Sequence, residues 1–149
     1  MHLTVKNTNL IRNKINEIIE KKQLKIQYPN IIAVSKTFSQ SMILPLLESG
    51  HTHFGENRIQ EALLKWTDLK IKYQNIKLHF LGKLQSNKAK NAVQIFDYIH
   101  SLDNQKLASN LDNHQKNLQK NVKLFIQINI GNEEQKSGIA LNELKDFYN

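Results

Sequence analysis

A short apolar stretch followed by a helical pattern recurs along this chain about every 20 to 25 residues. Strands that alternate with helices in this way are typical of a parallel sheet with right-handed crossover connections. The pattern therefore predicts an α/β fold. The expected strands are IIAVSK (31–36), THFGEN (52–57), KLHFLG (77–82), DYIHSL (97–102) and VKLFIQINI (122–130).

A helix is expected before the first strand and after every strand. The leading helix covers residues 8–27, where apolar side chains recur at helical spacing until Pro29 and Asn30 end it. Gly50 is expected to cap the C-terminus of the helix that follows the first strand. The later helices are expected at residues 41–50, 58–73, 86–96 and 104–121, and from about residue 141 onward.

Two architectures contain this strand–helix unit. A doubly wound dinucleotide-binding sheet is the weaker option, because the chain contains no Gly-x-Gly-x-x-Gly motif. A TIM-type (β/α) barrel is the stronger option, but a closed barrel needs eight units and about 250 residues. The 149 residues supply five units. We therefore expect a single domain, residues 1–149, with the fold of an incomplete TIM-type barrel.

The net charge of +8 raises the question of nucleic-acid binding. The positive charge comes almost entirely from lysine, with Arg12 and Arg58 as the arginines, although arginine is the usual residue for reading bases and clamping phosphates. The lysines are scattered among many asparagines and isoleucines. A basic nucleic-acid-binding module is therefore the weakest of the alternatives, and no nucleic-acid partner is expected.

The remaining composition points to an ordinary globular protein of the cytoplasm. No apolar run approaches the ~18 residues that a membrane span needs, so no membrane partner is expected. The first residues lack the apolar core of a secretory signal. The chain has no cysteine, which excludes disulfides and thiolate metal sites.

Lys36 is the most unusual polar residue at a strand end. It directly follows four apolar residues, and in a parallel α/β fold the functional side chains gather where the strands stop. If Lys36 alternates with Val34 and Ile32 toward one face, its amine enters a largely apolar interior. Desolvation would lower the pKa of this amine, and a neutral amine attacks carbonyls to form Schiff bases. The residues alone do not identify the carbonyl.

A metal site is not expected. His51 and His53 lie two residues apart, with Glu56 nearby, and so give a loose imitation of a set of metal ligands. No third histidine and no His-Glu-x-x-His arrangement completes it. The chain also contains no P-loop, and residue order does not justify a Ser-His-Asp set.

Five strings occur in order along the chain: IIAVSKT, HFGENRIQEALLKW, LHFLGKLQSNKAK, IHSLDNQKLASNL and FIQINIGNEEQKSGI. Together they resemble the pyridoxal-phosphate homeostasis protein family, whose members are similar to the barrel domain of bacterial alanine racemase. The resemblance runs from about residue 8 to the last residue. It is specific, because GEN-x-x-QE and LQSNK are unusual strings.

This resemblance implies a modified TIM barrel, related to fold-type III proteins, with an extra N-terminal helix. It implies that Lys36 holds pyridoxal 5'-phosphate (PLP) as an aldimine. It further implies a non-enzymatic carrier in vitamin B6 homeostasis, whose partners are PLP and, beyond it, PLP-dependent apoenzymes or amino acids. A fragment of a fold-type III enzyme, such as an amino-acid racemase, is the alternative. The other cofactor-binding positions that match family motifs are Asn57, His79, Gly82, His100 and Ser101.

The chain departs from the family pattern at three places. Family members usually have a proline soon after SKT, where this chain reads Thr37-Phe38-Ser39, and Lys83 stands where other residues are expected. The family also continues through three more strands, which carry the residues that hold the phosphate. We therefore expect a C-terminally truncated member whose cofactor site is incomplete, with open sheet edges that favour aggregation or pairing with another chain.

Overall fold

The computed structural model describes residues 1–148 and contains five strands. The strands are β1 (Ala33–Val34), β2 (His53–Glu56), β3 (Lys77–Phe80), β4 (Tyr98–Leu102) and β5 (Lys123–Ile126). The α-helices are α1 (Leu3–Lys21), α2 (Gln40–Glu48), α3 (Ile59–Lys72), α4 (Ala89–Ile95), α5 (Gln105–Leu118) and α6 (Leu144–Tyr148). Two short 3-10 helices are η1 (Ser86–Lys88) and η2 (Leu141–Glu143).

The five strands form one parallel sheet in the order β1-β2-β3-β4-β5. This order confirms the predicted series of βα units. Within the described residues β1 pairs only with β2, and β5 only with β4, so the sheet does not close on itself. The fold is that of an incomplete barrel with two open edges.

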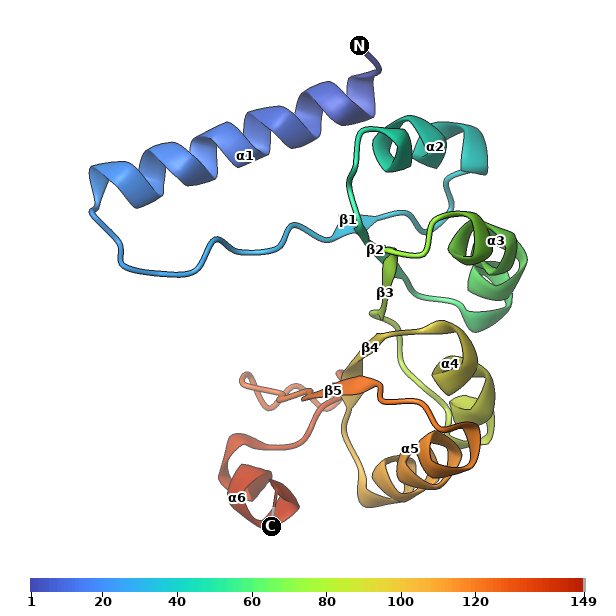
Figure 1. Ribbon diagram of the computed structural model, residues 1–149. Coiled ribbons are helices and arrows are strands. Elements are labelled where there is room, and N and C mark those ends of the chain that lie inside the picture. Colours follow the sequence, from blue (N-terminus) through green and yellow to red (C-terminus); the bar gives the residue numbers. More distant parts are fainter. Residues whose placement is uncertain (149) are drawn as a thin grey trace.

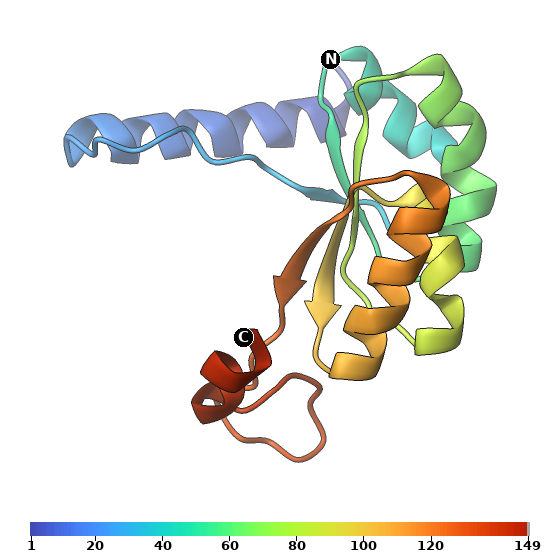
Figure 2. The ribbon, with the colours of Figure 1, turned by 60° about the horizontal axis from the view of Figure 1, so that its bottom comes forward.

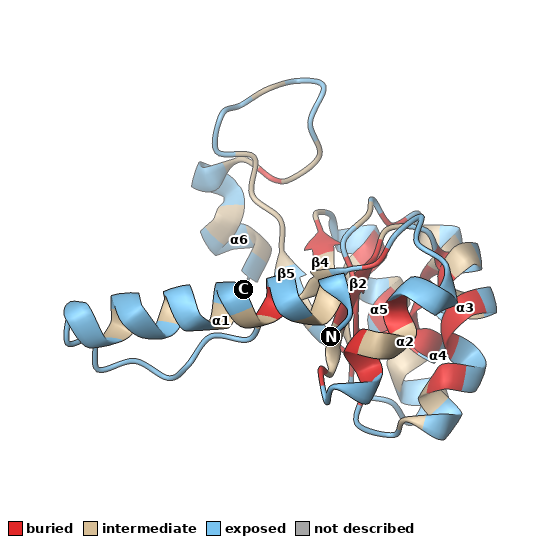
Figure 3. Ribbon diagram, turned by 90° about the horizontal axis from the view of Figure 1, so that it is seen from above, coloured by how far each residue is buried: buried red, intermediate tan, exposed pale blue. Residues whose placement is uncertain are grey.

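Helices α2 to α5 lie together on one side of the sheet (Figures 1 and 2). Alternate side chains of the strands form the core with these helices, and Figure 3 shows the buried residues gathered where the sheet and helices α2 to α5 meet. Trp66 of α3, for example, is fully buried and packs on Phe54 of β2 with ring centroids 4.9 Å apart. Gly50, with φ of 87°, ends the turn after α2 as expected.

The opposite side of the sheet is not covered by these helices, and we call it the open face. It carries the other set of alternate side chains: Val34, His53, His79, His100 and Phe125. Val34 is 46% exposed and Phe125 is 50% exposed. Apolar side chains therefore meet solvent on this face.

The leading helix differs from the prediction. It was expected at residues 8–27, but α1 runs from Leu3 to Lys21, and Gln23 with φ of 50° directs the chain out of the helix. Helix α1 and the extended segment after it project from the body of the molecule (Figure 1). The apolar side chains that predicted the helix lack a partner along most of its length, so Leu10 and Ile18 are about half exposed.

The first and last strands are shorter than predicted. β1 has two residues in place of the expected 31–36, and β5 ends at Ile126, although an isolated bridge between Ile128 and Ile139 follows it. Each of these strands has a partner on one side only, which limits the length of regular pairing. No helix within residues 1–148 has the length and apolar character needed to cross a membrane.

Candidate cofactor site

Lys36 lies in a turn directly after β1, and it is exposed. The expectation that its amine enters an apolar interior is therefore wrong. Val34, two residues earlier, is also exposed, because nothing in residues 1–148 covers the open face beside β1. The Lys36 amine forms no hydrogen bond and no ion pair with another described residue. It is a free amine at the carboxyl end of a strand.

Both neighbours of Lys36 are held by carboxylates. On one side, the Ser35 hydroxyl donates to Glu56 Oε1 at 2.9 Å. On the other side, the Thr37 N–H donates to Glu61 Oε1 at 2.8 Å, and Thr37 has a φ of 67°. A non-glycine residue holds such a conformation only when its surroundings determine it. The turn formed by Ser35, Lys36 and Thr37, which we call the lysine turn, is therefore held in place, although the amine of Lys36 is free.

Lys65 of α3 joins these two carboxylates into one network. Its Nζ donates to Glu56 Oε1 at 2.9 Å, to Glu61 Oε1 at 3.1 Å and to the Ser35 carbonyl at 2.9 Å. Trp66 Nε1 also donates to Glu56 Oε1 at 2.9 Å. We call Glu56, Glu61 and Lys65 the carboxylate clamp. Glu56 is 0% exposed, and its buried donors all reach Oε1, whereas Oε2 is buried without a hydrogen-bond partner in residues 1–148.

The electrostatics of Glu61 agree with this arrangement. The Thr37 N–H, followed by the Lys65 ammonium, lowers the pKa of the Glu61 carboxyl below its usual value. Glu61 is therefore ionised at neutral pH and accepts both hydrogen bonds.

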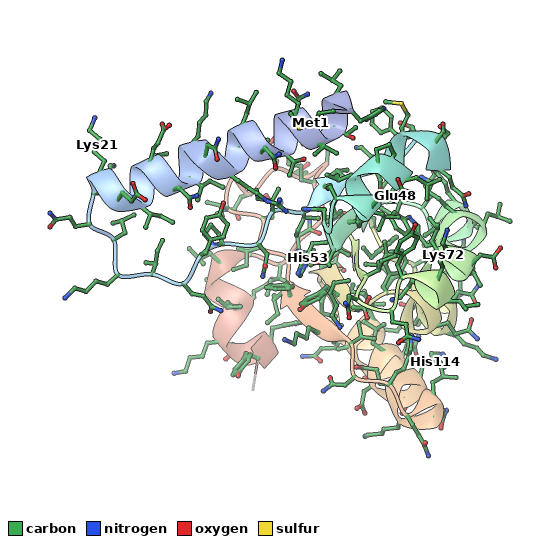
Figure 4. The ribbon with its side chains drawn as sticks, turned by 45° about the horizontal axis from the view of Figure 1, so that its top comes forward. Met1, Lys21, Glu48, His53, Lys72 and His114 are labelled. Atoms are coloured by element: carbon green, nitrogen blue, oxygen red, sulfur yellow. The ribbon has the colours of Figure 1, made fainter. Side chains whose placement is uncertain are left out.

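Three histidines form a chain across the open face. His53 Nδ1 lies 2.9 Å from His79 Nε2, and His79 Nδ1 lies 2.9 Å from His100 Nε2. They come from β2, β3 and β4. Figure 4 shows His53 on the side of the sheet opposite to Glu48 and Lys72, which mark the helical side. The structure thus brings together His79 and His100, two of the predicted site residues, and adds His53.

The histidine chain is partly shielded from water by aromatic rings. Tyr98 stacks on His79 with centroids 4.3 Å apart and planes 7° apart, and Phe125 stacks on His100 at 4.5 Å and 15°. Burial, together with the neighbouring imidazoles, lowers the pKa of His79 to about 4, and burial also lowers the pKa of His100 and of His53. Neutral imidazoles donate with one nitrogen and accept with the other, which is what a hydrogen-bonded chain requires.

The sequence grouping of His51, His53 and Glu56 is not assembled as a set of ligands. His51 Nδ1 lies 3.1 Å from Arg12 Nη2, whereas Glu56 belongs to the carboxylate clamp and accepts a hydrogen bond from Lys65. Within residues 1–148 there is no group of three His, Cys, Asp or Glu side chains placed to hold a metal ion. The role of His53 was missed, although a sequence signal exists, since His-Phe occurs in both THFGEN and KLHFLG.

Asn57 and Gly82 meet at the carboxyl edge of the sheet. A Cβ on Gly82 would lie 2.3 Å from the carbonyl oxygen of Asn57, so only glycine allows the two loops to approach this closely. Gly82 therefore serves backbone packing in this structure. The Asn57 Oδ1 is buried and has no partner among the described residues.

Ser101 and His100 share an irregularity in β4. The pairing with β5 shifts register between Ile99 and Leu102, so that both residues lie opposite Phe125. Such bulges re-aim side chains and are frequent beside functional sites. Ser101 is 3% exposed, and its hydroxyl has no hydrogen-bond partner in residues 1–148.

The predicted residues thus fall into three separate groups, which no hydrogen bond between described residues connects. Lys36 stands in the clamped turn, Asn57 with Gly82 lies between two loops, and His79, His100 and Ser101 lie on or beside the open face. A free amine and two buried polar atoms without partners fit a small polar ligand that carries a carbonyl group.

Comparison with known proteins gives a consistent family. Residues 9–149 match the family described as Alanine racemase, N-terminal domain. The chain is 38% identical over 139 residues to the pyridoxal phosphate homeostasis protein of Buchnera aphidicola subsp. Schizaphis graminum, covering 93% of this chain and 60% of the relative. It is 37% identical to the protein of the same name from Haemophilus influenzae, covering 93% and 58%.

Solved structures agree with the fold. The structure of PipY from Synechococcus elongatus PCC7942 with PLP bound is similar at a TM-score of 0.71 and 36% identity, covering 89% of this chain and 61% of PipY. The structure of PipY without PLP gives a TM-score of 0.73. This chain therefore spans about 60% of the length of its relatives.

Proposed function

Because the chain belongs to the alanine racemase N-terminal domain family, we propose that it binds PLP through Lys36 and serves in PLP homeostasis. Two findings support this proposal. The similar proteins of Buchnera and Haemophilus are named pyridoxal phosphate homeostasis proteins, and PipY has been solved with PLP bound. Since the chain spans about 60% of these relatives, their function comes to it as a proposal.

The observation that carries the proposal is the clamped turn around Lys36. The lysine has a free amine, while Ser35 and Thr37 on either side of it are held by the carboxylate clamp. PLP supplies an aldehyde that reacts reversibly with amines. The protein supplies an amine whose backbone is already ordered, so that less conformational entropy is lost when the ligand is held.

Further residues would orient the ligand. Asn57 and Ser101 each have a buried side-chain oxygen without a partner in residues 1–148, and either atom can hydrogen-bond a polar group of the cofactor. His100, kept neutral by burial, can accept or donate one hydrogen bond without adding charge. These roles, like that of Lys36, are part of the proposal.

We extend the proposal to the absence of a robust catalysed reaction. General acid–base catalysis needs a titratable group within hydrogen-bond reach of the reacting atom, and no described side chain forms a hydrogen bond or an ion pair with the Lys36 amine. The natural exchange partners would then be amino acids or PLP-dependent apoenzymes in the cytoplasm. Amino-acid racemisation has weaker support, because the named relatives are homeostasis proteins.

The proposal is tested by trapping the bound cofactor. The purified chain is incubated with an equimolar amount of PLP, reduced with borohydride and digested, and the labelled lysines are mapped by mass spectrometry. We expect Lys36 to carry most of the label and Lys36→Ala to lose at least about 80% of it. The visible absorbance of the bound cofactor, recorded before reduction, should fall in parallel.

Lys116→Ala provides a matched control, because Lys116 is a strongly exposed lysine far along the chain on α5. It should leave the label on Lys36 unchanged. Label spread evenly over the surface lysines would contradict the proposal. Turnover of a free amino acid such as alanine would instead support the racemase alternative.

A further inference from the structure

A basic pocket lies between the loop after β2 and the loop after β3. Its volume is about 370 Å³. We call it the basic pocket, and three of its residues are cationic: Arg58, Lys83 and Lys88. The other lining residues are Asn57, Ile59, Gln60, Phe80 and Gln85.

The three cations have no anionic partner among the described residues. The lysines that form ion pairs are Lys65, Lys70, Lys116 and Lys136. The side chains of Arg58, Lys83 and Lys88 form neither an ion pair nor a hydrogen bond within residues 1–148. Glu61, three residues after Arg58, is occupied by Lys65 and by the Thr37 N–H.

The backbone adds N–H donors, whose positive partial charge also attracts an anion. Helix α3 has 14 residues and begins at this pocket, and no side chain caps its first turn. The free N–H groups of Ile59 and Gln60, and the positive end of the helix dipole, therefore favour an anion there. The Oδ1 of Asn57 is buried without a partner in residues 1–148, and turning this amide would present its NH₂ as a donor in place of the oxygen.

Packing of the backbone and of buried side chains holds the two loops of the basic pocket in place. The contact of Gly82 with the Asn57 carbonyl sets the two loops against each other. Lys83, next to Gly82, and Arg58, next to Asn57, therefore line the same pocket. Ile59 and Phe80 are 4% and 2% exposed and form a rigid floor.

We propose that the basic pocket binds the phosphate group of a phosphate monoester. Such a group carries up to two negative charges and presents several acceptor oxygens, which match three cations and the uncapped N–H groups. The phosphate has two sources of the same chemistry. One is the phosphate of PLP held at Lys36, which rests on the proposed function, and the other is a separate phosphorylated small molecule.

The test titrates inorganic phosphate, followed by two-dimensional NMR of backbone amides. Wild-type protein should show saturable shifts at Ile59, Gln60 and Lys83. The triple variant Arg58→Gln/Lys83→Gln/Lys88→Gln should bind at least tenfold more weakly. A control triple variant with the same loss of charge away from the pocket, Lys25→Gln/Lys106→Gln/Lys145→Gln, should bind like wild type. Equal weakening in both triple variants, with folding intact by circular dichroism, would overturn the proposal.

A second arm identifies the source of the phosphate. Borohydride labelling of Lys36 is compared for PLP and for pyridoxal, which lacks the phosphate. Loss of the preference for PLP in the pocket variant assigns the pocket to the cofactor's own phosphate. An unchanged preference together with weaker phosphate binding assigns it to a separate ligand. Failure of Lys36 to label at all would refute the proposed function while leaving the phosphate titration as an independent result.

Discussion

At the scale of single residues, the histidine chain is the least ordinary feature of this protein. His79 is 4% exposed and contacts an imidazole at each of its nitrogens. Protonating it would place a charge in a buried position, and the neighbouring ring that donates to neutral His79 would have to change its tautomer in order to accept. The folded protein therefore favours the neutral form of His79.

This preference leads to a pH dependence of stability. The pKa of His79 is about 4 in the folded state, against 6.5 for the unperturbed group, so below pH 6.5 the unfolded chain takes up the proton first. The free energy of unfolding should be unaffected above pH 6.5 and should fall between pH 6.5 and about 4. We expect a loss of about 3 kcal/mol from this residue, measured by urea unfolding across that range.

His79→Asn should flatten the pH dependence, although the variant loses stability at neutral pH because the two hydrogen bonds are changed. His114→Asn on α5 is the matched control, because the ring of His114 makes no hydrogen bond within residues 1–148. A wild-type stability that stays constant from pH 6.5 to 4 would refute this account of the chain.

The positions of the site residues could be predicted from the sequence more readily than their environments. Lys36, Asn57 and His100 all lie where the strand pattern placed them, since strand ends are visible as the end of an apolar run. The exposure of Lys36 could not be predicted, because it depends on which segment covers the face beside β1. The contact of His53 with His79 likewise depends on the register between β2 and β3.

At the scale of elements, helix α3 links the candidate site to the core. One side of it packs Trp66 on the sheet, and its Lys65 reaches the lysine turn through the carboxylate clamp. The first residues of the same helix line the basic pocket. The proposed bond of Lys36 to an aldehyde and the proposed binding of a phosphate group in the basic pocket thus both depend on α3.

Glu56→Ala should therefore affect both stability and labelling. It removes the acceptor of three buried donors and leaves the Lys65 ammonium with only part of its compensation. We expect a loss of about 3 kcal/mol in urea unfolding and a lower yield of label on Lys36.

Two variants serve as controls for this change. Asp112→Ala removes an exposed ion pair with Lys116 and should cost less than about 0.5 kcal/mol. Lys65→Met added to Glu56→Ala should restore part of the stability, because it removes the uncompensated charge. If Glu56→Ala costs no more than Asp112→Ala, the clamp does not hold the turn.

Element boundaries show where pattern reasoning stops. Helices α3 and α5 begin and end within a few residues of the expected 58–73 and 104–121, because their apolar faces are buried against the sheet. The prediction for α1 was shifted, because its periodic apolar face has no partner along most of its length. Periodicity predicts that a helix is amphipathic, but only packing fixes its ends.

At the scale of the whole molecule, one side of the sheet is covered by helices α2 to α5 and the other side is the open face. The predicted order of strands is confirmed, and so is the prediction that the sheet stays open. Two edge strands and the exposed apolar side chains of the open face, Val34 and Phe125, then reach solvent together. Unpaired backbone groups at a strand edge, together with exposed apolar side chains, favour pairing of the sheet with another chain.

We expect this surface to cause self-association, in spite of the net charge of +8. In sedimentation velocity at about 50 μM and moderate salt, the wild-type chain should sediment as species larger than the monomer. Val34→Lys/Phe125→Lys places charges on the edge strand β1 and on the open face, where the native side chains are 46% and 50% exposed. This double variant should associate at least tenfold more weakly.

Leu64→Lys is the matched control, because Leu64 is 87% exposed on α3, on the other side of the sheet. An apolar residue there does not border an open edge, so its replacement should leave the association unchanged. If Leu64→Lys weakened association as much as the double variant, general hydrophobicity or net charge would be responsible. A monomeric wild-type chain at this concentration would show that the open face is stable in water without a partner.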